Sequence, residues 1–183
     1  MDHSITTKLG ALSLLRMSPF LEVSRFPHVG VIENILDTVS LGGDIFPQEV
    51  DSLAGWKDGL GIVEDATTAE GLWLYGSGFI LKMANINGYD NSRRSKEMTY
   101  ASQTFWEICD AIVNDGDGFL YPEYRDVEFN LASVEIMWQE RDISLLATGG
   151  DQGSFEARVN EIQRHMEKRK LFARIVAECG GWV

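Results

Sequence analysis

The chain has 183 residues and a formal net charge of -12, with 28 Asp and Glu residues against 16 Lys and Arg residues. Its hydrophobic fraction of 44% and aromatic fraction of 10% exceed those of a disordered acidic segment, so we expect a single folded domain over residues 1–183. The acidity argues against direct nucleic-acid binding and against anionic membrane surfaces, because both attract proteins through Lys and Arg.

The first residues do not form the pattern of a secretory signal peptide. Asp2 replaces a basic start, and Lys8 and Arg16 bracket a short apolar run. No segment reaches the roughly eighteen apolar residues of a membrane span. Cys109 and Cys179 fall on apolar sides of predicted helices and are expected to be free thiols, with a disulfide between them as the alternative. These features predict a cytoplasmic protein.

Helical spacing dominates the N-terminal part of the chain. It predicts a helix over residues 4–17 that stops before Pro19, with Arg16 in step with two leucines. A second helix is predicted around residues 32–39, where apolar residues recur at steps of three and four and two glycines follow. Residues 47–54 predict a short turn of helix that begins at a proline.

A period of two then replaces the helical period. Gly59–Glu64 predicts a short strand, and Gly71–Met83 predicts a β-hairpin with its turn at residues 76–78. Both faces of this hairpin are largely apolar, so we expect it to be covered on both sides or to pair with further strands. Ala84–Ser95, which includes two adjacent arginines, predicts an exposed loop.

The helical period returns at Lys96 and continues to about residue 113. Residues 127–146 fit either a strand or a helix, and we favour a helix over Asn130–Asp142. The last and clearest element is a long helix over Ser154–Glu178. The sequence therefore predicts an α+β fold, in which several helices and a long C-terminal helix pack on a small antiparallel β-sheet or hairpin.

Residues 107–142 form the most acidic stretch, with ten Asp and Glu residues and two Arg. Such a charge excess on a folded surface attracts cationic partners and repels polyanions. We expect a docking surface for a basic protein in this stretch. Its predicted members are Glu107, Asp110, Asp115, Asp117, Glu123, Asp126 and Glu128.

The Asp115-Gly116-Asp117-Gly118 segment is the one candidate metal motif. Acidic oxygens at alternate positions before a glycine are typical of a calcium loop. With Gly118 at the sixth place, however, the first ligand place holds Val113 and the twelfth holds Tyr124. We therefore predict a helix stop and a turn, with calcium as the alternative, and no cofactor.

No catalytic motif occurs at the spacing that its chemistry requires. The three histidines are isolated, and only His28, in a predicted loop, is kept as a candidate. The sequence also lacks the Gly-x-Ser-x-Gly pattern of a serine nucleophile.

Three classes of function remain. The first is a non-enzymatic binding or inhibitory protein that covers a basic surface, as immunity proteins, antitoxins and nucleic-acid mimics do. The second is an enzyme whose carboxylate-based site is assembled from distant residues. The third is a subunit of a larger assembly or homo-oligomer that pairs through the apolar hairpin and the C-terminal helix. We favour the first class.

Overall fold

The computed structural model describes residues 3–115, 130–149 and 152–182, and all regular structure within these ranges is helical. The predicted α+β fold is therefore wrong, because the described residues contain no strand and no sheet. The helices are α1 (His3–Val23), α2 (Val29–Ser40), the 3-10 turn η1 (Pro47–Val50), α3 (Asp51–Gly59), α4 (Ala69–Met83), α5 (Asn91–Asp115), α6 (Leu131–Gly149), α7 (Gln152–Arg164) and α8 (Met166–Cys179).

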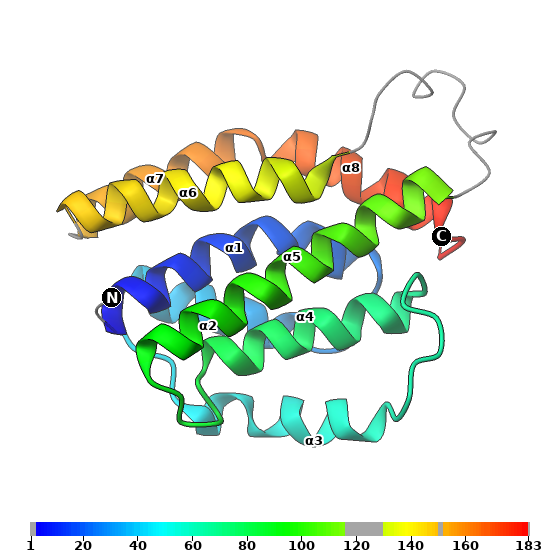
Figure 1. The fold of residues 1–183 in the computed structure, drawn as a ribbon, viewed down its shortest axis with the longest axis horizontal. Coiled ribbons are helices and arrows are strands. Elements are labelled where there is room, and N and C mark those ends of the chain that lie inside the picture. Colours follow the sequence, from blue (N-terminus) through cyan, green and yellow to red (C-terminus); the bar gives the residue numbers. More distant parts are fainter. Residues whose placement is uncertain (1–2, 116–129, 150–151, 183) are drawn as a thin grey trace.

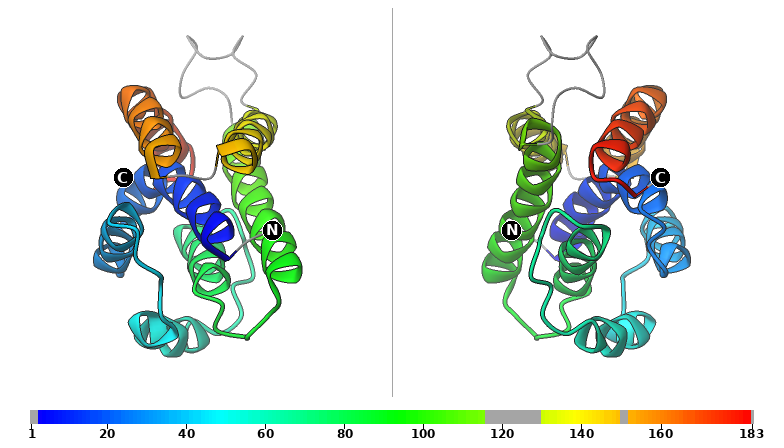
Figure 2. Two further views of the ribbon diagram at one scale, coloured as in Figure 1. Left: turned by 90° about the vertical axis from the view of Figure 1, so that its left-hand side faces the viewer. Right: turned by 90° about the vertical axis from the view of Figure 1, so that its right-hand side faces the viewer.

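Helix α1 runs through the middle of the bundle (Figure 1) and packs against α2, α4, α5, α6, α7 and α8. Seen end-on in Figure 2, α6 and the α7–α8 pair lie on one side of α1, and α4 lies on the other. Helix α3 packs on α4 at the edge of the bundle. Buried apolar side chains from all eight α-helices form one connected core cluster. No helix in the described ranges combines the length and apolar character needed to cross a lipid bilayer.

Helix α1 continues through Pro19 instead of ending before it. A proline inside a helix lacks the N–H that would bond the carbonyl four residues earlier, here that of Leu15. The Ser18 hydroxyl donates a hydrogen bond to that carbonyl at 3.0 Å, which satisfies it. The extra turn brings Phe20 into the core with 1% of its surface exposed.

The predicted hairpin over residues 71–83 is instead most of helix α4. The Thr68 side chain caps this helix by accepting a hydrogen bond from the Gly71 N–H at 3.2 Å. Because α1, α3 and α5 all pack on α4, the helix has no single polar face. Gly76, predicted in a turn, lies at the contact with α1, where a Cβ atom would be 2.6 Å from a methyl carbon of Leu21. The glycine is needed for close helix packing rather than for a turn.

Two further predictions in this region are corrected. Residues 59–64 do not form a strand, since α3 extends to Gly59 and irregular chain follows. The exposed loop predicted over residues 84–95 ends early, because α5 begins at Asn91. Arg94, expected in that loop, is buried and donates hydrogen bonds to Thr7 Oγ1 at 3.1 Å and to the Met83 carbonyl.

The helices predicted around residues 32–39, 47–54 and 96–113 are confirmed, and the helix favoured from residue 130 is confirmed and extends to Gly149. The long C-terminal helix is wrong as predicted, because the chain turns at His165. There the His165 N–H bonds the Ile162 carbonyl at 3.0 Å, a tighter turn than the α-helical one. Two shorter helices, α7 and α8, result.

Candidate functional site

The predicted acidic docking surface is only partly described by the structure. Glu107 lies on α5, is exposed, and accepts a hydrogen bond from Gln103 at 2.8 Å. Asp115 is the last residue of α5. Four members, and with them half of the calcium candidate, lie outside the described residues: Asp117, Glu123, Asp126 and Glu128.

Asp110 has a structural role that its position in the sequence did not indicate. Its two carboxylate oxygens accept hydrogen bonds from the backbone N–H groups of Leu131 at 2.7 Å and Ala132 at 2.9 Å. These donors belong to the first turn of α6, which has no intrahelical acceptors for them. Burial raises the pKa of Asp110, and the two hydrogen bonds oppose that rise without cancelling it. Asp110 thus fastens α6 to α5.

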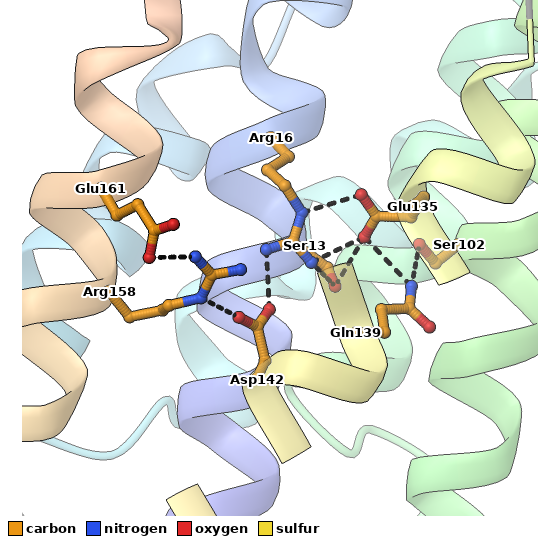
Figure 3. A network of polar contacts seen from close by, with 8 residues as sticks. All are labelled: Ser13, Arg16, Ser102, Glu135, Gln139, Asp142, Arg158 and Glu161. Carbon is orange, nitrogen blue, oxygen red and sulfur yellow. Dashed lines mark hydrogen bonds and ion pairs between the residues drawn. The ribbon is translucent and has the colours of Figure 1, made fainter. Parts of the chain in front are cut away.

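Two other carboxylates of the acidic stretch, Glu135 and Asp142, are buried in the bundle and bind one arginine (Figure 3). Arg16 donates from Nε and Nη2 to the two oxygens of Glu135 and from Nη1 to Asp142, each at 2.7 Å. Burial by itself would lower the pKa of Arg16, but these two carboxylates reverse that effect and raise it. The two negative charges are therefore neutralised inside the protein.

The ion pairs continue from Asp142 into α7 (Figure 3). Arg158, 1% exposed, donates from Nε to Asp142 at 2.5 Å and lies 2.5 Å from a carboxylate oxygen of Glu161. Arg141 of α6 reaches the other oxygen of Glu161 at 2.9 Å. This network joins α1 to α6 and α7, two helices that lie far from α1 in the sequence.

The buried carboxylates Glu135 and Asp142 both accept hydrogen bonds from Arg16. No group of three or more His, Cys, Asp or Glu side chains gathers in ligating range among the residues that the structure places. His28 stacks against Trp56, with 4.9 Å between ring centroids. Cys109 and Cys179 are separate thiols.

A different site emerges where α8 faces α5 and α6. A pocket of about 240 Å³ opens between these helices, with α1 at its base. Core residues form part of its wall, since Phe20 and Trp106 are each only 1% exposed. The apolar lining residues are Phe20, Trp106, Leu131, Val134, Trp138 and Phe172.

The polar side of this aromatic pocket is contributed mainly by the start of α8. His165, Lys168 and Arg169 line it together with Glu135 of α6. The Arg169 guanidinium lies 5.9 Å from the ring centroid of Trp106 and 5.7 Å from that of Trp138. Burial lowers the pKa of Arg169 to about 10, and the charge of Arg16 contributes to this shift.

Trp106, which lines the aromatic pocket, carries an unused hydrogen-bond donor that solvent does not reach. Its indole Nε1 is buried and has no acceptor in the described structure. Buried indole N–H groups normally have one. A pocket of this kind, apolar with a few convergent polar groups, is the usual form of a small-molecule site.

No family model matches this sequence, and comparisons with curated proteins and with solved structures find no significantly similar chain. The geometry of the aromatic pocket is therefore the basis for a proposed function. The sequence did not predict this pocket, because its lining comes from α1, α5, α6 and α8, which are distant in the chain.

Proposed function

We propose that this protein binds a small organic molecule in the aromatic pocket between α5, α6 and α8. The observation that carries the proposal is a space of about 240 Å³ whose lining is mostly aromatic and apolar, with a few polar side chains gathered mainly on its α8 side. Concave, mostly apolar spaces with a few convergent polar groups are the usual form of a small-molecule site.

The walls of the aromatic pocket support a preformed site. Glu135 is fixed by Arg16, and Asp110 fastens the first turn of α6, which carries Leu131. Phe20 stacks edge-to-face on Trp106, with 4.9 Å between ring centroids. Since these contacts hold the wall without a ligand, binding needs little reorganisation, which favours affinity.

A pocket-filling substitution tests the proposal. Val134, 41% exposed, lines the aromatic pocket, whereas Ile136 has the same exposed fraction on α6 and is not among the residues that line this pocket. We expect V134W to occlude the site and I136W to leave it open.

The measurement is a titration with a panel of single-ring compounds, neutral and charged, followed by isothermal calorimetry. At least one compound should bind the wild-type chain, lose tenfold or more in affinity in V134W, and change less than twofold in I136W. Absence of binding across the panel, or equal affinity in V134W, would refute the proposal.

A further inference from the structure

The α8 side of the aromatic pocket is positively charged. Lys168 and Arg169 lie in the first turns of α8, and His165 directly precedes them. The Lys168 ammonium lies 5.4 Å from the ring centroid of Phe172. The beginning of a helix is also the positive end of its dipole, which adds to the field of these side chains.

Glu135, whose side chain also lines the aromatic pocket, offsets only part of the positive charge of this wall. Its two oxygens accept hydrogen bonds from Arg16 at 2.7 Å, and Oε1 accepts two more, from Gln139 at 3.1 Å and Ser13 at 3.3 Å. A carboxylate with this many donors has little capacity for another cation. The pocket therefore keeps a surplus of positive charge.

Arg169 is the cation with the most to gain from an anion. Within the described structure it contacts the faces of Trp106 and Trp138, and none of its five N–H groups has a hydrogen-bond acceptor. Its pKa is lowered to about 10 because partial burial desolvates the charged guanidinium. An oxyanion would stabilise that charge and could accept two parallel hydrogen bonds from the guanidinium.

The size of the space limits what such an anion can be. An apolar cavity of about 150 Å³ holds one benzene molecule. The aromatic pocket, at about 240 Å³, has room for one ring and a short polar arm. Its flat walls, Trp106, Trp138 and Phe172, suit an aromatic ring, which packs on them edge-to-face or offset.

We infer that the occupant is an aromatic carboxylate, a single ring that bears a carboxylate on an arm of one or two carbons. Its ring lies among the apolar and aromatic side chains of the pocket, and its carboxylate meets Arg169 and Lys168. This inference rests on the proposed function, since it specifies the ligand class of the same pocket.

Three probes of nearly equal shape test the charge requirement: phenylacetate, phenylacetamide and phenethylamine. We expect phenylacetate to bind at least tenfold more tightly than the neutral amide, because charge-assisted hydrogen bonds replace neutral ones. The cationic amine should bind more weakly than the amide. Calorimetric titration of the full chain gives the three affinities.

Variants then assign the preference to Arg169. R169Q should bring the acid and the amide to within about twofold of each other, with the amide affinity unchanged. K170Q is the matched control, because Lys170 is the next residue of α8, pairs with Glu167 at 3.1 Å and does not line the aromatic pocket. If R169Q lowers the melting temperature, K168Q serves as a second variant, expected to weaken phenylacetate several-fold through loss of the other lining cation.

The possible outcomes separate the two proposals. If the amide or the amine binds as tightly as the acid, and V134W abolishes that binding, the site stands and the carboxylate preference is wrong. If none of the three probes binds, the inference is wrong, and the wider panel decides the proposed function. A preference for the acid that survives in both R169Q and K168Q also refutes the inference.

Discussion

Arg16 of α1 and Glu135 of α6 are joined by two parallel hydrogen bonds of 2.7 Å, and their side chains are 0% and 2% exposed. In R16M, Glu135 and Asp142 would be left in the bundle without their shared cation. Removing one member of a buried ion pair destabilises a protein by about 3–5 kcal/mol, because the remaining charge stays desolvated. Urea denaturation should show a loss of this size.

The matched control for R16M is K170M, which removes the cation of an exposed ion pair with Glu167. Exposed pairs contribute little, so the free energy of unfolding should change by less than about 1 kcal/mol. A similar change in both variants would contradict the role given to the buried network.

Asp110 and Glu107 lie three residues apart on α5 and should respond differently to truncation. D110A removes the acceptor for two N–H groups of α6, with an expected loss of about 1–2 kcal/mol in the free energy of unfolding. E107A, at an exposed position, should stay within about 0.5 kcal/mol of the wild type. Equal losses in urea denaturation would contradict the capping role.

Docking to a basic protein stays a prediction from the sequence, and Glu107 is its most direct test. For a basic protein that co-purifies with the chain, E107K should weaken binding several-fold at low ionic strength and less at high ionic strength, because salt screens exposed charges. The affinity is measured at both salt concentrations by surface plasmon resonance. Unchanged affinity at low salt would remove Glu107 from the interface.

Gly76 permits the close approach of α1 and α4. G76A would force its new methyl group against Leu21, whose fully buried side chain would have to shift, so we expect a loss of about 1–3 kcal/mol in the free energy of unfolding. G55A is the control, since Gly55 lies in α3 with nothing within 4 Å of its Cβ position. G55A should raise the free energy of unfolding by up to about 1 kcal/mol, because alanine has a higher helix propensity than glycine. The melting temperature should therefore fall in G76A and rise in G55A.

Lys82 of α4 and Glu97 of α5 form a partly exposed ion pair at 2.8 Å. The hydrogen bond from Lys82 and its charge lower the pKa of Glu97. A lowered carboxyl pKa stabilises the fold above the usual glutamate pKa of about 4.3, and this stabilisation is lost as the pH falls through the folded-state value. K82M should therefore raise the pKa of Glu97 in an NMR titration and destabilise the protein more at pH 7 than at pH 3.

Part of the fold was predictable from the sequence because some helices keep one polar face. The helix around residues 32–39 is such a case, with Ile32, Ile35 and Val39 buried. Helix α4 was not predictable, because neighbouring helices pack on several of its sides and it is apolar all round. In such a helix, apolar residues can alternate in the sequence as they do in a β-hairpin. Gly76, one of the two glycines that suggested a turn, instead permits contact with Leu21 of α1, a segment distant in the chain.

The aromatic pocket was beyond prediction for a related reason. Trp106 and Arg169 are 63 residues apart in the chain, and they come together only because α8 packs against α5. The sequence did contain one usable signal, the basic run beside Phe172, but it gave no sign of which helix that run would face.

The buried arginine of α1 also imposes an order on how the protein is made. Glu135 follows Arg16 by 119 residues, so at ordinary translation rates Arg16 waits roughly 6–24 s for its acceptor. Helices α4 and α5, neighbours in the chain, can pack on each other during that interval. We therefore expect Arg16 to lose its bound water only after the C-terminal third of the chain has been made, so that the burial of Arg16 is a late step in folding.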